Sequence, residues 1–358
     1  MKKILPCVLA VIAVLALPVL VPTSPALLVD SPTVIWASAM DEWGSPSGVV
    51  ITVYGLMIAL GAAIAIGLAG ALGRKRASCG YDVCLPLVSG VFALCCSHWL
   101  FCVLRWSYVV NDLGEGWGFI FQFWKGGYTM YGAILGGLLG AFVYARAKRL
   151  PVAGAVDAIM PGAAVLLLLG RFAEQFTLQG RGTYVVNEAL SMLPFAVENE
   201  WGEMQVHVYV YEALAALAAL IVMLVMLRRG KAAPGRAAET GLTIISAAQV
   251  LLDSWRGDEL IRFGFVRLNM ICAAVTLACL MALRVYRAVK AGGVKPWTIL
   301  RVVLLLLGAG AVLVVEFGLE GKMGITMDNT LLYGIQAAAV TLMGAVVLID
   351  GNTKNVNE

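Results

Sequence analysis

The stretch VAGAVDAIMPGAAVLLLLGRF, residues 152 to 172, decides what kind of protein this chain is. Its only ionisable side chains are Asp157 and Arg171, and an unbroken apolar run, Ala163 to Leu169, precedes the arginine. A helix of about 20 apolar residues crosses the hydrocarbon core of a bilayer. The stretch therefore predicts a transmembrane helix with an arginine near its end.

The composition of the whole chain supports the same class. Of its 358 residues, 61% are hydrophobic and 13% are charged, whereas a soluble domain has roughly 45–50% and about 25%. So much apolar surface cannot be buried in one aqueous core. The net charge of +4 is small and the basic residues stand at the ends of apolar blocks, so nucleic-acid binding is not expected.

The eight cysteines form no CxxC and no ligand spacing with histidine. Buried cysteines ordinarily act as small apolar side chains. Six of the eight lie inside apolar blocks: Cys84, Cys95, Cys96, Cys102, Cys272 and Cys279. We therefore expect no metal site and no cofactor.

Residues 1–22 begin with two lysines and continue as an apolar run from Ile4 to Val21. This pattern is typical of an uncleaved signal anchor or of a cleavable signal peptide. Small residues suited to cleavage occur around Ala26 and at 37–39, so both alternatives stay open. Residues 23–47, rich in proline and serine, are predicted to be an extracytoplasmic linker.

Residues 48–290 contain the apolar stretches of a membrane core, seven in all, which lie at residues 49–72, 83–104, 131–145, 152–172, 206–227, 241–255 and 265–285. The aromatic segment Trp117–Trp124 is too short to cross and is expected at the interface. The polar residues 173–205 are long enough for a small cap. Residues 291–358 predict two more spans, 299–317 and 331–349, and a tail. The predicted fold class is an all-α polytopic membrane protein with a seven-helix core, an N-terminal helix and two C-terminal helices.

Basic clusters alternate with these spans in a consistent way. Residues 74–76, 146–149, 228–236 and 284–295 all fall on one side, which the positive-inside rule makes cytoplasmic. We therefore expect the acidic cap outside and the C-terminus in the cytoplasm. The two halves show no repeat, which argues against a secondary transporter.

Ionisable groups inside apolar spans are rare and are functional candidates by default. They are Asp157, Arg171, Glu212, Asp253 and Arg256, with His98 as a titratable neighbour. Arg171 should lie toward the outer side, at the depth of lipid head groups. It either snorkels to the interface or binds a phospholipid phosphate, which a guanidinium can grip with two hydrogen bonds.

Glycine is concentrated around the third core span, at Gly126, Gly127, Gly132, Gly136, Gly137 and Gly140. Small residues let helices pack closely within a membrane. They also let backbone come close to a lipid, and the two interpretations are compatible.

Short motifs on these spans resemble those of one family, the bacterial prolipoprotein diacylglyceryl transferases. VYGLM at 53–57 resembles the family's WYGLM, and WKGGYTMYG at 124–132 is similar to its W-D/E-G-G-M-S-F-H-G segment. The fourth span keeps the spacing of the D-x-x-x-P…G-R-x-G-N motif through Asp157, Pro161, Gly170 and Arg171.

Two further segments extend the resemblance to roughly residues 48–290. Tyr211-Glu212 is similar to the end of the family's H-P-S/T-Q-L-Y-E motif. Asp253, Trp255 and Arg256 resemble its R-x-x-x-E-x-x-R motif.

The resemblance implies that a diacylglyceryl group moves from phosphatidylglycerol, or a related phospholipid, to the lipobox cysteine of a secreted prolipoprotein. This would take place in the bacterial cytoplasmic membrane. The cysteine thiolate attacks the terminal glyceryl carbon and glycerol phosphate leaves, which calls for a proton acceptor and for cations. The residues expected to contact substrate are Tyr54, Gly126, Gly127, Gly132, Asp157, Arg171, Glu174, Glu212, Gln249, Asp253 and Arg256.

Several positions depart from the family's motifs. Tyr131 stands where the family has histidine, Glu174 where it has asparagine, and Gln249 where it has arginine. A tyrosine of ordinary pKa, about 10, is a weak base at neutral pH. His98 is the other candidate base, so the expected catalytic residues are Tyr131, His98 and Arg171.

Three functions therefore compete. The first is an active diacylglyceryl transferase or a relative acting on another thiol or lipid. Arg171 and the glycines favour retained lipid binding. Tyr131 and Gln249 favour a non-catalytic homologue that binds phospholipid or escorts lipoproteins. An unrelated transporter or channel is the third alternative.

Overall fold

The computed structural model describes residues 4–21, 33–40, 46–75, 82–177, 179–184, 194–198, 202–230, 232–257, 262–263, 266–290, 293–321, 324 and 327–349. The chain forms two compact units. Met1–Gly180 and Ala216–Gly241 make up the first unit, and Arg181–Ala215 and Leu242–Glu358 make up the second.

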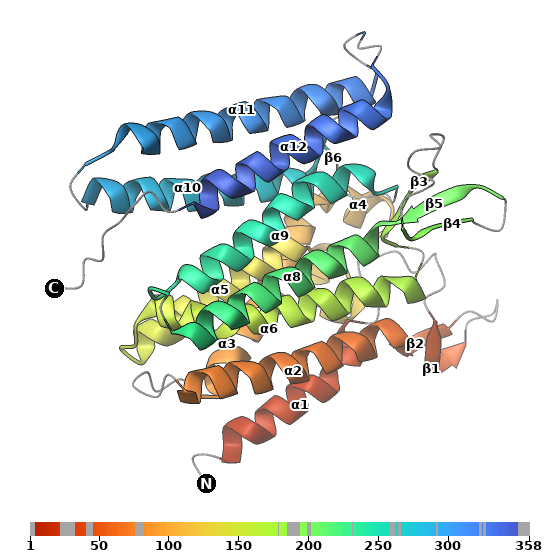
Figure 1. Cartoon of the computed structure of the whole chain (residues 1–358). Coiled ribbons are helices and arrows are strands. Elements are labelled where there is room, and N and C mark those ends of the chain that lie inside the picture. The colour runs from red at the N-terminus through yellow and green to blue at the C-terminus, as the bar shows by residue number, and fades with distance from the viewer. Residues whose placement is uncertain are drawn as a thin grey trace. The chain divides into compact units, whose positions relative to one another are not determined.

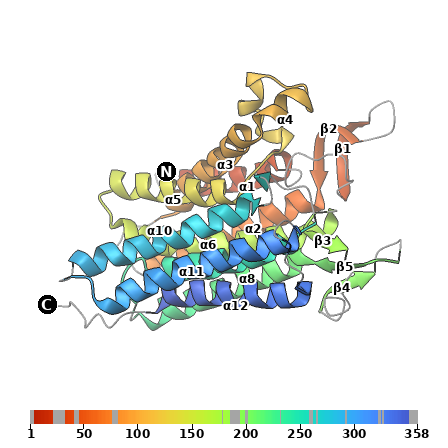
Figure 2. The ribbon, with the colours of Figure 1, turned by 90° about the horizontal axis from the view of Figure 1, so that it is seen from above.

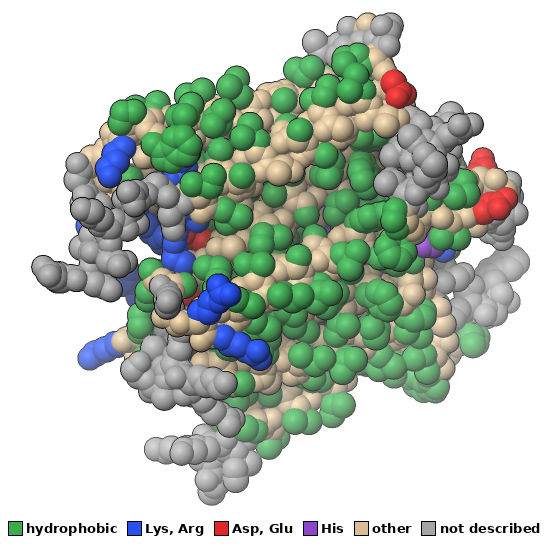
Figure 3. Space-filling model, viewed as in Figure 1, with side chains coloured by type: hydrophobic (Ala, Val, Ile, Leu, Met, Phe, Trp, Pro, Cys, Tyr) green, Lys and Arg blue, Asp and Glu red, His purple; other side chains and the backbone are tan. Residues whose placement is uncertain are grey.

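Eight helices among the described residues are long and apolar enough to cross a membrane. They are α2 (Val53–Lys75), α3 (Cys84–Leu104), α5 (Met130–Ala147), α6 (Val152–Ala173), α8 (Val208–Arg229), α10 (Leu268–Lys290), α11 (Pro296–Leu319) and α12 (Asn329–Leu348) (Figure 1). Their visible faces are covered with hydrophobic side chains (Figure 3). The prediction of an all-α polytopic membrane protein is confirmed.

The sixth predicted span forms a helix, α9 (Arg236–Trp255), that is not among these eight. It carries Glu239 in its first turn and a series of buried polar side chains along its length. Those that belong to the second unit are Thr243, Ser246, Gln249 and Asp253, spaced three or four residues apart. That spacing gathers them on one face of the helix, which points into the protein.

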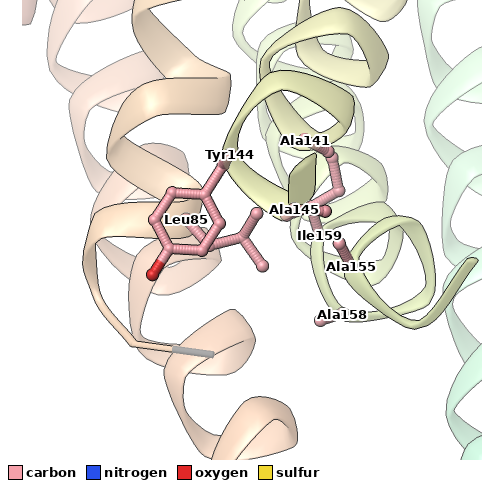
Figure 4. Close-up of a cluster of buried hydrophobic side chains, with 7 residues drawn as sticks. All are labelled: Leu85, Ala141, Tyr144, Ala145, Ala155, Ala158 and Ile159. Carbon is pink, nitrogen blue, oxygen red and sulfur yellow. The ribbon is translucent and has the colours of Figure 1, made fainter. Parts of the chain in front are cut away.

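Within the first unit, α3 packs along α5 and α2 along α6, and α1 (Ile4–Leu20) lies on α2 (Figures 1 and 2). Small side chains allow the close approach of these helices. Figure 4 shows one such contact, in which Leu85 of α3 lies beside Tyr144 of α5, in one buried cluster with alanines of α5 and α6. The hydroxyl of Tyr144 donates to Asp82 Oδ1 at 2.6 Å, which ties α5 to the chain just before α3.

Several short elements lie where the sequence predicted only a linker or an interfacial segment. Residues 34–40 and 46–52 pair as an antiparallel hairpin of β1 (Val34–Met40) and β2 (Pro46–Thr52), so α2 begins four residues later than the predicted first span. The aromatic segment forms two short 3-10 turns, η2 (Trp117–Phe121) and η3 (Phe123–Lys125), which follow α4 (Trp106–Asn111). Trp117 and Trp124 are exposed.

The second unit contains the C-terminal helices and two small sheets. The helices α11 and α12 form an antiparallel hairpin beside α10 (Figures 1 and 2). A three-stranded antiparallel sheet of order β3-β5-β4 lies in the predicted cap, with bounds β3 (Arg181–Tyr184), β4 (Ala196–Glu198) and β5 (Met204–His207). The strands β6 (Arg262–Phe263) and β7 (Val266–Arg267) pair just before α10.

Some sequence predictions fall outside the described residues. They concern the possible cleavage site at Ala26, the basic residues Arg76 and Lys231, the acidic residues Glu188 and Glu200, and the C-terminal tail.

Candidate functional site

Arg171 and Glu174 form a shielded ion pair at the end of α6. Arg171 lies in the last turn of this helix, and Glu174 begins the 3-10 turn η4 (Glu174–Phe176) that follows. The guanidinium Nη1 donates to Glu174 Oε1 at 2.6 Å, and Nη2 lies 3.5 Å from the sulfur of Met130. The side chains are 11% and 3% exposed, so the pair has little water to screen it.

Tyr54 is buried close to this end of α6. It packs with Ala173, two residues after Arg171, and with Val21 from the end of α1. The hydroxyl of Thr52 accepts a hydrogen bond from the N–H of Gly55 at 3.0 Å. This contact caps the first turn of α2 and fixes the place of Tyr54.

The glycines between α3 and α5 make turns and close helix contacts. Gly126 and Gly127 have φ angles of 81° and 80°, which disfavour any residue with a side chain. A Cβ at Gly132 would lie 2.8 Å from Cys96 O, and one at Gly136 would lie 2.2 Å from Phe92 O. The prediction of close packing is confirmed, and any role of these glycines in lipid binding stays a prediction.

The same contact carries buried hydrogen bonds that the sequence did not suggest. Ser97 Oγ donates to Thr129 O at 2.7 Å and accepts from Thr129 N at 2.9 Å. These bonds join α3 to the residue before α5.

His98 is fully buried, and both of its ring nitrogens face backbone carbonyls. Nδ1 lies 3.0 Å from Gly127 O and Nε2 lies 2.9 Å from Phe119 O. Aromatic rings of Phe119, Phe123 and Tyr128 surround the imidazole. A general base needs a lone pair directed at the proton it takes, and here both nitrogens are directed at the protein's own backbone. The geometry suits a residue that holds the glycine turn and η2 in place.

Tyr131, the other predicted base, is buried in the first turn of α5. Its neighbour in the chain, Met130, contacts Arg171 through sulfur. The first turn of α5 is thereby placed beside the Arg171–Glu174 pair.

Asp157 lies at the start of α9 rather than beside Arg171. Its Oδ2 accepts from Gly235 N at 2.7 Å and its Oδ1 accepts from Ala238 N at 2.9 Å. The first N–H groups of a helix have no partner within the helix, so this buried carboxylate caps α9. No side chain at the start of α9 needs to serve that role.

A second buried ion pair, Glu212–Arg256, lies in the second unit. Arg256 Nη1 donates to Glu212 Oε2 at 2.6 Å, and the side chains are 2% and 3% exposed. Gln249 Nε2 donates to the other oxygen of Glu212 at 2.9 Å. The structure therefore brings together three of the predicted site residues.

Asp253 joins this cluster through Gln249 and also caps a helix. Gln249 Nε2 lies 3.3 Å from Asp253 Oδ1, and Asp253 Oδ2 accepts from Met270 N in the first turn of α10. Arg267, which the sequence analysis did not select, is buried and donates to the carbonyl oxygen of Arg256.

Polar contacts continue from α9 into the C-terminal hairpin. Ser254 Oγ donates to Gln336 Oε1 at 3.0 Å, and Gln336 Nε2 donates to Glu316 Oε1 at 2.7 Å. Both Gln336 and Glu316 are buried. Glu316 was not among the predicted site residues, although an acidic residue inside the predicted span 299–317 is a functional candidate by default.

Within the part of the chain that the structure describes, no group of three histidine, cysteine or acidic side chains is placed to hold a metal ion. The clusters described above hold shielded arginines, carboxylates and a tyrosine among apolar helices. These features define a polytopic membrane protein with charged pairs held inside it.

Comparison with known proteins identifies the family. The sequence profile of the prolipoprotein diacylglyceryl transferases matches residues 45–286, which is more than half of the chain. The chain therefore belongs to the prolipoprotein diacylglyceryl transferase family.

Three relatives illustrate how distant the similarity is. The phosphatidylglycerol–prolipoprotein diacylglyceryl transferase of Listeria innocua is 24% identical over 243 residues, 66% of this chain and 86% of that protein. The enzyme of the same name from Bacillus licheniformis is 24% identical over 248 residues, 68% and 90% of the two chains. That of Streptomyces griseus is 30% identical over 169 residues, 45% and 50%.

Proposed function

We propose that this protein transfers a diacylglyceryl group from phosphatidylglycerol to the cysteine thiol of a prolipoprotein. The observation that carries the proposal is the shielded Arg171–Glu174 pair at the end of α6, within the part of the chain that matches the family. The names of the relatives supply the donor and the acceptor.

The reaction sets clear demands on the site. The sulfur of the acceptor cysteine attacks the terminal glyceryl carbon, an S–C bond forms, and the C–O bond to phosphate breaks. Glycerol phosphate leaves with the bonding electrons, and the thiol proton passes to a base. The site must hold the growing negative charge on the phosphate, and a buried cation does this more strongly than an exposed one.

Arg171 is the proposed phosphate ligand. Its side chain is mostly shielded from water, and Glu174 and Met130 fix its orientation. Because the guanidinium is already oriented, little side-chain conformational entropy is lost when it binds an oxyanion. Arg256, held by Glu212 in the second unit, is a second cation that the resemblance assigns to substrate binding.

Tyr131 is the better placed of the two predicted bases. It follows Met130, which touches Arg171, whereas both nitrogens of His98 face backbone carbonyls. The hydroxyl of Tyr131 stands at the position where the family has histidine.

A second candidate function is phospholipid binding or lipoprotein escort without transfer. Glu174 favours it, because this carboxylate occupies Arg171 with an internal anion at a position where the family has asparagine. The two functions share a lipid site and differ in turnover.

Complementation of a bacterial cell depleted of its own transferase separates them. We expect the full chain to restore growth and to yield diacylglyceryl-cysteine on a reporter lipoprotein, detected by mass spectrometry. Tyr131→His should keep or raise that yield, because imidazole titrates near neutrality. Binding of phosphatidylglycerol by the purified chain without any modified lipoprotein would favour the second function.

We further propose that the chain lies in the bacterial cytoplasmic membrane with its C-terminus in the cytoplasm. The basic residues at the end of α5 and just after it, Arg146, Lys148 and Arg149, support this orientation. A reporter fused after Arg149 should report the cytoplasm, and one at Glu198 should report the outer side.

A further inference from the structure

The N-terminal helix α1 has the composition of a secretory signal sequence. Two lysines precede it, and its 17 residues contain no charged or strongly polar side chain. It lies outside the residues that match the family, yet it packs on α2, which lies inside them. Figure 1 shows α1 running beside α2 for much of its length.

One face of α1 meets α2. Ala10, Pro18 and Val21 are buried, and Leu17 and Leu20 are partly buried. The opposite face exposes large apolar side chains, namely Leu5, Val8, Leu9, Val11, Ile12 and Leu15. The helix is therefore fixed by a narrow inner stripe, mostly near its C-terminal end.

The C-terminal end of α1 contacts residues that belong to the motifs of the family-like core. At Gly55 an added Cβ would lie 3.0 Å from the carbonyl oxygens of Pro18 and Val21. Leu17, Leu20 and Val21 pack in one cluster with Tyr54 and Ile58 of α2. A side chain at position 55 would therefore push the two backbones apart.

Tyr128 also contacts the end of α1, from the glycine segment before α5. Its hydroxyl lies 2.8 Å from Leu20 O and 2.6 Å from Phe123 O, and its ring packs in the same cluster. Burial raises the pKa of Tyr128, so the hydroxyl remains protonated and can donate to the carbonyl oxygen of Leu20, the last residue of α1.

We propose that this α1-contact surface, made of Tyr54, Gly55, Ile58 and Tyr128, is the docking site for the signal helix of a prolipoprotein substrate. In this structure α1 occupies it as an intramolecular stand-in. The inference rests on the proposed function, and it adds where the acceptor binds and what competes with it.

The position of the surface suits that role. The acceptor cysteine of a prolipoprotein follows an apolar helix that begins with basic residues, and α1 is likewise an apolar helix preceded by two lysines. The end of α1 packs against Ala173, two residues from the proposed phosphate ligand Arg171. A substrate helix bound in the same way would bring its cysteine to the lipid site.

The test uses the full chain in lipid nanodiscs and a synthetic peptide. The peptide carries two lysines, an apolar helix as long as α1, a cysteine directly after it, and a photo-cross-linking residue beside that cysteine. We expect ultraviolet light to attach it to residues 54–58 of α2. The double variant Leu17→Ser/Leu20→Ser weakens the packing of α1, which competes with the peptide, and leaves the docking surface unchanged. It should therefore bind the peptide several-fold more tightly than the parent.

The matched control is Leu5→Ser/Leu15→Ser, which alters α1 equally but on its exposed face. It should bind the peptide as the parent does. Leu17→Ala provides a milder variant that shortens one inner-face side chain of α1 and leaves the docking surface unchanged. It should also raise peptide affinity if α1 competes.

Equal peptide affinity in the parent, Leu17→Ala and the inner-face double variant, each confirmed as folded by thermal melting, would overturn the proposal. So would cross-links that map away from α2. Because binding is measured without turnover, a chain that binds the peptide and transfers no lipid contradicts the proposed function and leaves this inference standing.

Discussion

The guanidinium of Arg256 lies 2.6 Å from the carboxylate of Glu212, and both side chains are almost completely buried. Gln249 donates to the second oxygen of that carboxylate, so Glu212 is satisfied on both sides. Two charges removed from water in this way are held by their mutual attraction and hydrogen bonds. The pair fixes α9 to α8 within the second unit, whether or not it also contacts lipid.

Removing one partner should therefore be more harmful than removing both. We expect Arg256→Ala to lower the free energy of unfolding by about 3–5 kcal/mol, because Glu212 is left as a buried single charge. The double variant Glu212→Leu/Arg256→Met should recover most of that loss. Chemical denaturation in detergent measures stability, and phosphatidylglycerol transfer measures function.

The double variant also decides what the pair does. If it is stable and inactive, Arg256 or Glu212 acts on substrate. If it is stable and fully active, the pair is only structural and its assignment to the site is wrong.

Two adjacent glycines of α5 provide a matched test of the helix contact with α3. A Cβ at Gly136 would lie 2.2 Å from Phe92 O, whereas one at Gly137 would lie 3.9 Å from the nearest atom, Ala93 Cβ. We expect Gly136→Ala to destabilise the protein by roughly 1–3 kcal/mol through overpacking. Gly137→Ala should be neutral or slightly stabilising, because alanine is the better helix former. Equal melting temperatures for the two variants would contradict the packing described.

The helices could be predicted from the sequence because the length of an apolar run in a membrane protein is set by the bilayer. The predicted span 152–172 and the observed α6 (Val152–Ala173) differ by one residue. The hairpin of β1 and β2 was not predicted. Strands of this length show only a weak alternation of apolar and polar side chains, and their pairing depends on the tertiary structure. The same reason applies to the sheet of β3, β4 and β5.

The site was predicted less well, because single residues do not reveal their partners. Asp157 was selected as an ionisable group in a span, and its bonds to Gly235 and Ala238, 78 and 81 residues away, show a helix cap. His98 was selected as a base, and its two carbonyl neighbours point to a structural role. The Arg171–Glu174 pair was foreseeable as an alternative, since residues three apart on a helical turn are neighbours.

Asp157→Ala should therefore affect stability without affecting lipid affinity. Loss of the two bonds that cap α9 should lower the free energy of unfolding by about 0.5–2 kcal/mol. Asp157→Asn, which keeps one acceptor oxygen, should lose less. Denaturation curves and phosphatidylglycerol titrations of both variants check this. A large loss of lipid affinity in a stable Asp157→Asn variant would return the residue to the binding site.

Glu174→Asn removes the internal anion that occupies Arg171 and installs the residue that the resemblance leads one to expect. Without lipid, the variant should melt at a lower temperature, because a shielded guanidinium loses its partner. With phosphatidylglycerol, it should be stabilised more than the parent, because the lipid phosphate can replace the carboxylate. The measurement is the shift in melting temperature on adding lipid.

The matched control for Glu174→Asn is Glu239→Gln. Arg236 and Glu239 form another ion pair three residues apart, at the start of α9. Its loss should leave the lipid-induced shift unchanged. A similar gain in both variants would mean that the effect is a general response to lost charge.

Variants of Arg171 distinguish a role in lipid binding from a role in holding the helices together. Its guanidinium reaches Glu174 at 2.6 Å and Met130 at 3.5 Å, so it has a structural role in any case. If it also binds the lipid phosphate, Arg171→Lys should weaken phosphatidylglycerol binding. Lysine keeps the positive charge but lacks the planar guanidinium that donates two hydrogen bonds to one phosphate. Arg171→Ala should weaken it further, by roughly tenfold or more, given about 1.5–3 kcal/mol for a charge-assisted hydrogen bond.

The purified variants are compared with Arg236→Ala, which breaks the other ion pair of the same spacing. Lipid titration and thermal melting are measured on the same samples. A fall in affinity that follows the order Arg, Lys, Ala at position 171, and is absent in Arg236→Ala, is the expected result. If Arg171→Ala binds phosphatidylglycerol as well as the parent while it melts earlier, the arginine only joins α6 to its neighbours, and the phosphate must be held elsewhere.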